Sequence, residues 1–422
     1  MTHFLTLSIA AVTFFFAPLF HPVSGDAKLG PDEIKYNPVV TAFDVDVYKH
    51  TRDATKDNGN IVVNALQLNA ALMMACNAAN GATEKEIKAL FKLTDNASCL
   101  DLFGVIFKMY TAAPHREFES GPMVNLLNEK YFTANRAYVD KTVLLNDKFM
   151  QGIGSKFNMT PVVADFAGNP EAARQAINTW VNKITEGNIK EFLPAGSVTG
   201  SERLIILNGD FLRLQWASTF DPTKTEKSTF VSADGSKSQT PYMSLNANVG
   251  FKSFDAARNI PAFTAVKLHS KYSTYSLSLL MPDNPKDFAA LENALTPEFI
   301  DSVVGANMPR QTVSIKIPKF DLDVTTDYKN VLESMGVKQL FSKTADLSRM
   351  TTATVSVDAW THHAMIEANE FGLKALSTSA SAIGKLVLAR GALPQSFDHP
   401  FLFIVQIEQT GYITHIGRVT KL

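Results

Sequence analysis

The chain has little cysteine, little excess charge of either sign and no long apolar run beyond its N-terminus. Its two cysteines, Cys76 and Cys99, are too few for a disulfide scaffold. The 40 Lys and Arg residues nearly balance the 41 Asp and Glu residues, which excludes a strongly basic nucleic-acid-binding surface and a charged disordered tail. With 45% hydrophobic and 19% charged residues over 422 positions, the chain is a globular protein that can bury a large core.

The sequence also lacks the short motifs that mark many enzyme active sites. HExxH, paired CxxC, a glycine-rich phosphate loop and the GxSxG elbow are all absent from it. His362 and His363 are its only adjacent histidines, and neighbours on a strand point to opposite faces, so we do not interpret them as a metal site. We therefore expect no catalytic residue, no metal and no cofactor.

The N-terminal residues have the pattern of a secretory signal. Residues 4–20 are uncharged, Pro18 interrupts them near their end, and small residues follow at Val23 and Gly25. The run is short for a membrane span, and no second long apolar run follows it. We predict that residues 1–25 are a signal peptide and that residues 26–422 are secreted to the extracellular space without a membrane partner.

Secretion gives meaning to two glycosylation sequons and to the two cysteines. The sequons begin at Asn96 and Asn158, and we predict both as glycosylation sites. Cys76 lies in an apolar run typical of a core, whereas Cys99 lies in a polar stretch beside a sequon. An oxidising compartment would permit their pairing, but the sequence favours two free thiols.

Hydrophobic periodicity predicts helices early in the chain and strands late in it. Helices are predicted over 66–80, 87–93, 171–185 and 327–335, the second of them opened by a capping box from Thr83 to Glu86. Strands are predicted over 204–211, 265–272, 275–282, 312–320, 399–407 and 410–419. Because helices and strands do not alternate, the pattern indicates an α+β fold.

One segment between two predicted strands is unusual. Residues 375–384 are almost all small or hydroxyl-bearing and have no clear periodicity. A long connection of this kind is usually functional, although its composition alone favours a flexible surface linker. Ala375, Ser377, Ser379 and Ser381 would share one face of a strand. The segment could therefore be a loop in one state and a central strand in another.

Several ordered segments resemble the serpin superfamily, and the similarity covers almost the whole mature chain. Residues 362–372 are similar to the strand and hinge before the serpin reactive loop, and residues 398–404 are similar to the segment after it. Residues 177–189 are similar to a family helix motif. Residues 207–222 are similar to the strand that leads to the breach tryptophan, here Trp216, and residues 414–419 are similar to the terminal strand.

The resemblance implies a single serpin domain with three β-sheets, about nine helices and an exposed reactive centre loop at about residues 370–397. A target protease would attack this loop and form an acyl-enzyme. The cleaved loop would then insert into the main sheet and carry the protease with it. The chemistry would belong to the nucleophile of the protease, and the inhibitor would be a monomer held by a kinetic barrier above a more stable state.

The resemblance also assigns the hinge and the reactive bond. The hinge would comprise Glu370, Gly372, Leu373, Ala375 and Ser377.

In the family, the hinge glutamate stands sixteen residues before the residue that precedes the scissile bond. Counting from Glu370 gives Leu386–Val387, which suits a chymotrypsin- or elastase-like pocket. The loop is about three residues longer than is common, and counting from its C-terminal side leads to Arg390–Gly391, which suits a trypsin-like enzyme. The run from Leu386 equally suits papain-like cysteine proteases.

Three positions depart from the family pattern. Asn64 begins a segment that replaces the Ser-Pro-x-Ser element of the shutter, where Asn178 and His362 would keep a polar network with amides in place of hydroxyls. Leu373 replaces the small hydroxyl residue that follows the hinge glycine, and its bulk is expected to slow insertion. Leu214 stands where glycine is common, for which the sequence offers no physical account.

These observations leave three functions open. The first is a secreted protease inhibitor that acts by suicide trapping, and the second is a non-inhibitory carrier, storage or binding protein. The third is inhibition of papain-like cysteine proteases through the same loop. Lys85, Lys88 and Lys92 are spaced as on a helix, but the interleaved glutamates indicate an ordinary solvated face, so we expect no glycosaminoglycan partner.

Overall fold

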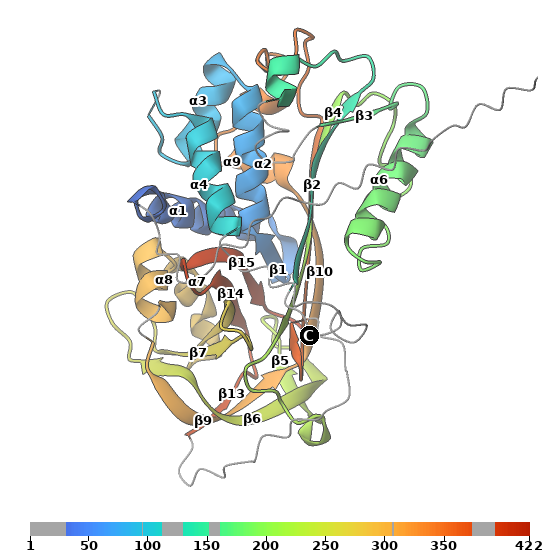
Figure 1. Cartoon of the computed structure of the whole chain (residues 1–422). Coiled ribbons are helices and arrows are strands. Elements are labelled where there is room, and N and C mark those ends of the chain that lie inside the picture. The colour runs from blue at the N-terminus through green and yellow to red at the C-terminus, as the bar shows by residue number, and fades with distance from the viewer. Residues whose placement is uncertain (1–30, 95, 112–129, 152–160, 306–307, 374–392) are drawn as a thin grey trace, which may run out of the picture.

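The computed structural model describes residues 31–94, 96–111, 130–151, 161–305, 308–373 and 393–422. Helices dominate the first part of this chain and strands dominate the second, as the α+β prediction requires. Figure 1 shows a long sheet, with β2, β4 and β10 labelled, that has α6 on one side and α1, α2, α4 and α9 on the other.

The described helices include the four predicted ones, three of which lie within two residues of the predicted bounds, whereas the one predicted over 87–93 begins at Gly81. Their bounds are α1 Pro31–Ala54, α2 Ala65–Ala78, α3 Gly81–Leu90, α4 Cys99–Thr111, α6 Pro170–Ile184, α7 Phe288–Asn293, α8 Pro297–Val304 and α9 Tyr328–Ser334. The predicted capping box is wrong, because Thr83 lies inside α3 and its hydroxyl accepts a hydrogen bond from the backbone N–H of Asp346 at 2.9 Å.

In the part of the chain that the structure describes, the main sheet contains six strands, and the hinge lies in it. In order across the sheet they are β10 Phe320–Asp327, β11 Ala359–Asn369, β12 Gly372–Leu373, β4 Leu204–Gln215, β2 Lys130–Asp140 and β3 Val162–Ala164. β11 and β4 are parallel and pair directly from Ala359 opposite Ile205 to Met365 opposite Phe211. Beyond that point the two-residue strand β12 lies between them.

The other strands form one continuous hydrogen-bonded path. Its order is β1 Ile61–Asn64, β15 Tyr412–Val419, β14 Phe401–Ile407, β8 Tyr275–Pro282, β7 Phe263–His269, β6 Lys237–Phe254, β9 Arg310–Pro318 and β13 Leu393–Ser396, with β5 Glu226–Val231 beside β6. The end of β6 pairs with β7, whereas its earlier part pairs with β5 and β9. This long strand therefore joins the second and third of the three expected sheets.

The main sheet separates two apolar cores. The larger core packs α1, α2, α4 and the other sheets against one face, and it includes Leu204, Ile206, Leu214 and Leu373. The smaller core packs α6 against the opposite face, where Ile205 and Leu207 of β4 lie. Leu204, Ile206 and Leu214 of β4 therefore face the large core, whereas Ile205 and Leu207 face α6, as strand alternation requires.

A small apolar pocket lies in the large core behind the first residues of β4. The residues lining it include Ala78 of α2, Ala137 of β2, Leu204 and Ile206 of β4, and Val357 just before β11. Since all of its lining side chains are apolar, the pocket is suited to receive another apolar side chain rather than an ordered water.

The two cysteines form a disulfide, which corrects the prediction of two free thiols. Cys76 of α2 and Cys99 at the start of α4 lie 5.9 Å apart between their Cα atoms, within the range that a disulfide spans. Their pairing could not be predicted from the sequence, because it depends on the packing of α4 against α2. The bond joins two helices and crosses no pair of strands in the main sheet.

Candidate functional site: the hinge and the opening of the main sheet

The hinge is a tight reversal of the chain at the end of β11. The side-chain oxygen of Asn369 accepts hydrogen bonds from the N–H groups of Phe371 at 3.0 Å and Gly372 at 3.3 Å. This turn places Gly372 opposite Asn369 and Leu373 opposite Ala368, antiparallel to β11. On its other side, β12 pairs with β4, with Gly372 opposite Gln215 and Leu373 opposite Leu214. The hinge residues Gly372 and Leu373 are thus already part of the main sheet.

The residues of β12 fit this narrow gap for two different reasons. A Cβ atom on Gly372 would collide with the backbone carbonyl of Leu214, so the close approach to β4 requires glycine there. Leu373 is fully buried, and its partner Leu214 is 1% exposed in the same core. The two leucines that depart separately from the serpin pattern are therefore cross-strand partners. This pairing gives the account of Leu214 that the sequence lacked.

Trp216 secures the hinge from the side of β4. Its indole N–H donates to the carbonyl of Asn369 at 2.8 Å, and its backbone N–H donates to the carbonyl of Phe371 at 2.9 Å. Trp216 is 3% exposed, so these bonds lie out of water. The predicted breach tryptophan therefore holds the turn that directs Gly372 and Leu373 between the strands.

Glu370 secures the hinge through residues next to β5 and β9. Its carboxylate accepts hydrogen bonds from Thr225 at 2.7 Å and from the Lys319 ammonium at 2.9 Å, and its carbonyl accepts one from the N–H of Phe220. Burial alone raises the pKa of Glu370, but the hydrogen bonds from Lys319 and Thr225 outweigh it and hold the pKa below its ordinary value.

A buried polar cluster lies farther along β11, at the predicted shutter. The backbone N–H of Asn64 donates to Nε2 of His362 at 3.2 Å, and the Asn64 amide lies 3.4 Å from Nε2 of His415. The Asn64 oxygen also accepts from the N–H of Gln67 and thereby caps α2. Since a backbone N–H can only donate, Nε2 of His362 is the acceptor in this hydrogen bond.

Asn178 does not belong to this cluster, which corrects its assignment to the shutter. It lies on α6, where its oxygen accepts from the N–H groups of Phe192 and Leu193 and its amide donates to the carbonyl of Leu193 at 2.8 Å. It therefore fixes the segment after α6. The residue missed at the shutter is His415, whose strand β15 pairs with β1, with His415 directly opposite Asn64.

His362 and His363 point to opposite faces of the sheet, as expected. His362 faces Asn64 and packs on the ring of Tyr328, whereas His363 contacts the carboxylate of Asp323 and the ring of Phe192. Within the described ranges, no group of three or more His, Cys, Asp or Glu side chains is placed to hold a metal ion.

Several predicted positions lie outside the described residues. These are the signal peptide 1–25, Asn158, the hinge residues Ala375 and Ser377, and the candidate bonds Leu386–Val387 and Arg390–Gly391. Asn96, the first residue of the other sequon, is exposed. None of the helices in the described part of the chain combines the length and the apolar character needed to cross a membrane.

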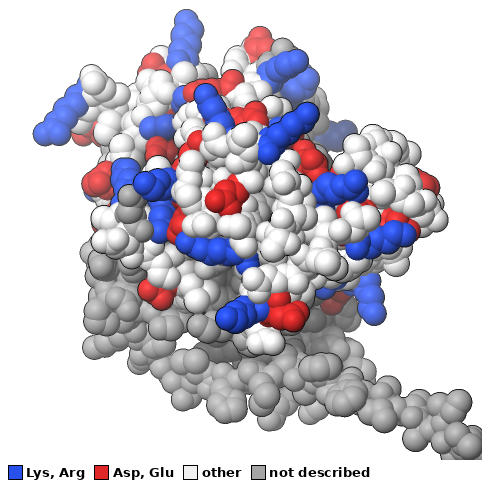
Figure 2. All heavy atoms as spheres, turned by 90° about the horizontal axis from the view of Figure 1, so that it is seen from above, with Lys and Arg blue, Asp and Glu red and all other residues white. Residues whose placement is uncertain are grey.

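The three lysines near α3 do not form a uniform basic surface. Lys88 is 6% exposed and pairs with Glu84 at 2.8 Å, and Glu84 also binds Arg349 at 2.7 Å. Figure 2 shows positive and negative side chains mixed over the molecule as seen from above. The charges around α3 thus largely offset one another.

Comparisons with known proteins agree with the geometry. The family model described as Serpin (serine protease inhibitor) matches residues 38–422. The protein "Iris" of Ixodes ricinus is 27% identical over 387 residues, which cover 90% of this chain and 97% of that protein.

Two solved structures share this fold. Native protease nexin-1 with heparin superposes with a TM-score of 0.78 at 23% identity, covering 92% of this chain and 100% of that one. Thyroxine-binding globulin in complex with thyroxine gives a TM-score of 0.78 at 19% identity, covering 92% and 99%. Since the family model matches nearly the whole described chain, the protein belongs to the serpin family.

Proposed function

We propose that this serpin is a secreted inhibitor that traps a target protease by inserting its cleaved reactive loop into the main sheet. The observation that carries the proposal is β12, because Gly372 and Leu373 already form the first two residues of a strand between β11 and β4. Serpins are in general inhibitors rather than catalysts, and the protease would supply the nucleophile.

The residues after Leu373 suit continued insertion. If the register of β12 continues, Ala375, Ser377, Ser379 and Ser381 follow Leu373 on the face directed to the large core. Small side chains can enter between packed strands with little displacement of the core. Leu373 itself is the bulky exception, and its buried contact with Leu214 supports insertion at this position rather than opposing it.

The compartment is part of the proposal. Disulfides persist in oxidising compartments, so the Cys76–Cys99 bond supports secretion, as do the uncharged residues 4–20. Asn96 is exposed and accessible to a glycosylating enzyme. We infer an extracellular glycoprotein that acts as a monomer on a protease.

A second candidate is a non-inhibitory binding protein. The solved thyroxine-binding globulin shares this fold and is a complex with thyroxine, so the fold by itself does not require inhibition. The replacement of the serpin shutter hydroxyls by Asn64 and its partners favours this alternative, because amides make more hydrogen bonds that would keep the sheet closed.

Incubation with a panel of proteases separates these functions. Chymotrypsin-, elastase-, trypsin- and papain-like enzymes are each mixed with the full chain and resolved on denaturing gels, with active-site-blocked proteases as controls. We expect an SDS-stable complex with a serine protease and a rise in unfolding temperature of the cleaved protein.

The mass of the released C-terminal fragment distinguishes Leu386–Val387 from Arg390–Gly391. Inhibition of the papain-like enzyme alone would move the target to cysteine proteases. Cleavage by every enzyme without a complex, and without a rise in unfolding temperature, would contradict trapping and favour the binding protein.

A further inference from the structure

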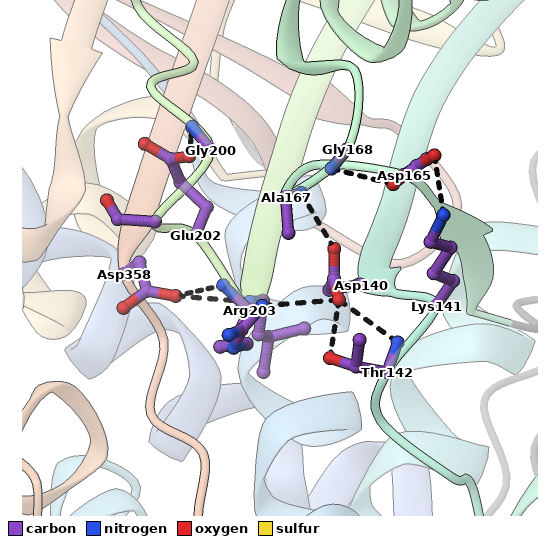
Figure 3. A network of polar contacts seen from close by, with 12 residues as sticks. Asp140, Lys141, Thr142, Asp165, Ala167, Gly168, Gly200, Glu202, Arg203 and Asp358 are labelled. Carbon is purple, nitrogen blue, oxygen red and sulfur yellow. Dashed lines mark hydrogen bonds and ion pairs between the residues drawn. The ribbon is translucent and has the colours of Figure 1, made fainter.

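Asp358 closes the main sheet at the end farthest from the hinge. It directly precedes β11, and its carboxylate accepts hydrogen bonds from the backbone N–H of Arg203 at 2.6 Å and of Leu204 at 3.2 Å (Figure 3). Its own N–H donates to the carbonyl of Leu204 at 3.0 Å. This one residue therefore makes three hydrogen bonds across the gap between β11 and β4.

The same network continues from Arg203 to β2, where its bonds join β4 to β2 and not to β11. The Arg203 guanidinium binds Asp140 at 3.2 Å, and Asp140 also accepts from the N–H groups of Thr142 and Ala167 (Figure 3). Asp140 is the last residue of β2, which is the neighbour of β4 on its other side. An inserted strand would leave β2 and β4 paired, so within this side-chain network only the bonds of Asp358 cross the gap between β11 and β4, in addition to the backbone pairing of the two strands.

Full insertion cannot occur while these bonds remain. Strands in a sheet lie about 4.8 Å apart, so a strand placed between β11 and β4 would move them to roughly twice that spacing. Because Leu373 is opposite both Leu214 and Ala368, ten further residues in the same register bring position 383 opposite both Leu204 and Asp358. A strand that stops earlier spares the contact, whereas one that reaches position 383 replaces it.

We propose that Asp358 is a latch, a positioning residue whose release from the N–H groups of Arg203 and Leu204 limits the last steps of loop insertion. The inference rests on the proposed trapping function. Hydrogen bonds to a carboxylate are stronger than those between neutral groups, so breaking them raises the barrier. The arriving strand can satisfy the freed N–H groups afterwards. The latch therefore affects the rate of insertion more than the stability of the inserted state.

Glu202 provides a matched control. Like Asp358 it is a carboxylate that accepts from two backbone N–H groups, those of Thr199 at 3.1 Å and Gly200 at 2.8 Å. These partners belong to its own loop before β4, so its bonds do not cross the gap (Figure 3). Loss of either carboxylate weakens the same end of the molecule, but only Asp358 holds β11 to β4.

The test compares the wild type, Asp358→Ala, Asp358→Asn and Glu202→Gln as full-length proteins. Each is cleaved rapidly in its loop by an excess of protease, and insertion is followed by tryptophan fluorescence, with Trp360 fully buried two residues from Asp358. The unfolding temperature is measured at the end. We expect insertion of Asp358→Ala to be roughly tenfold faster, that of Asp358→Asn to be intermediate because its amide still accepts, and that of Glu202→Gln to equal the wild type.

The outcomes separate the two proposals. A wild type whose unfolding temperature does not rise after cleavage overturns both trapping and the latch. A wild type that inserts, with Asp358→Ala within twofold of Glu202→Gln, overturns the latch alone. If Asp358→Ala does not fold, the same comparison with Asp358→Asn decides.

Discussion

The two ends of the main sheet hold β11 and β4 in opposite ways. At the hinge end the strands are parted, and β12 fills the gap with a glycine that approaches β4 closely and a leucine buried against Leu214. At the opposite end of the sheet, which we call the base, β11 and β4 are paired directly, and the Asp358 carboxylate adds charged hydrogen bonds to that pairing. The contacts at the hinge end are made by the added strand β12. The contacts at the base join β11 directly to β4, so a strand inserted there would break them.

This difference gives insertion a direction. In the proposed insertion, each residue that follows Leu373 would extend the apolar and backbone contacts that β12 has begun, so the early steps would be favoured. Later steps pass the cluster of Asn64, His362 and His415 and end at Asp358, where existing polar contacts must break. If the protein traps proteases as proposed, the barrier to insertion is therefore expected near the base, the end of the main sheet at Asp358.

The largest expected effect comes from a charge at the open end. Leu373→Asp would place an unpaired carboxylate against Leu214 in the large core, which costs on the order of 3 kcal/mol or more. We expect β12 to leave the sheet and the protein to be cleaved as a substrate. Denaturing gels would show no stable complex, and the unfolding temperature would not rise after cleavage.

Leu373→Val is the matched control, because it keeps the position apolar and introduces a β-branched side chain that suits a strand, so it should retain most of the complex. If hydrogen exchange showed the amides of Gly372 and Leu373 of the aspartate variant still protected, and complexes still formed, the hinge end would not depend on this apolar contact.

A smaller effect is expected from the pocket behind the base. Ala137→Val would add two methyl groups beside Leu204 and Val357, which fills empty apolar space and should stabilise the uncleaved protein by about 1 kcal/mol. In the proposed register, Ile383 reaches the same place from the face of Leu373, so the cleaved variant should gain less. Urea unfolding before and after cleavage measures both changes.

Ala364→Val is the corresponding control, since Ala364 of β11 is fully buried but does not line this pocket. There the added methyl groups would enter a fully buried site outside this pocket, and we expect destabilisation of about 1–3 kcal/mol. Equal effects of the two substitutions would show that the pocket has no particular capacity for a side chain.

The sequence predicts the parts of this comparison that depend on local pattern. The strand from 275 to 282 and the helix over 171–185 follow from periodicity, and the hinge and Trp216 follow from family motifs. Leu214 and Leu373 are visible as departures, but only the register of β12 makes them partners. The pairing register of β12 with β4 could not be predicted from the sequence.

Other features escape the sequence because they arise from packing. Cys76 meets Cys99 because α4 packs beside α2, and His415 meets Asn64 because β15 pairs with β1. An isolated aspartate before a strand, such as Asp358, has no sequence signal, since its partners are backbone N–H groups that every residue carries. The hinge could thus be predicted in outline, whereas the base could not.

The smallest expected effect is a difference in acid sensitivity at the hinge end. The pKa of Glu370 is lowered despite its burial, because Lys319 and Thr225 bind its charged form. A lowered folded-state pKa means that Glu370 contributes stability above its unfolded value of about 4.3, and that this contribution is lost as pH falls through the folded value. We therefore expect hydrogen exchange at Gly372 and Leu373 to accelerate as pH falls below about 4.3, after correction for the intrinsic exchange rate.

Glu370→Gln should remove most of that acceleration, a change of about two- to fivefold because an ion pair with a part-exposed lysine contributes at most about 1 kcal/mol. Burial raises the pKa of Asp140 at the base, but the hydroxyl and N–H of Thr142 outweigh it and lower the pKa below its ordinary value. The base should therefore keep its acid sensitivity in this variant. If Glu370→Gln instead abolished the pH dependence at both ends, the hinge and the base would respond to acid as one unit, and the separation drawn between them would not hold below neutral pH.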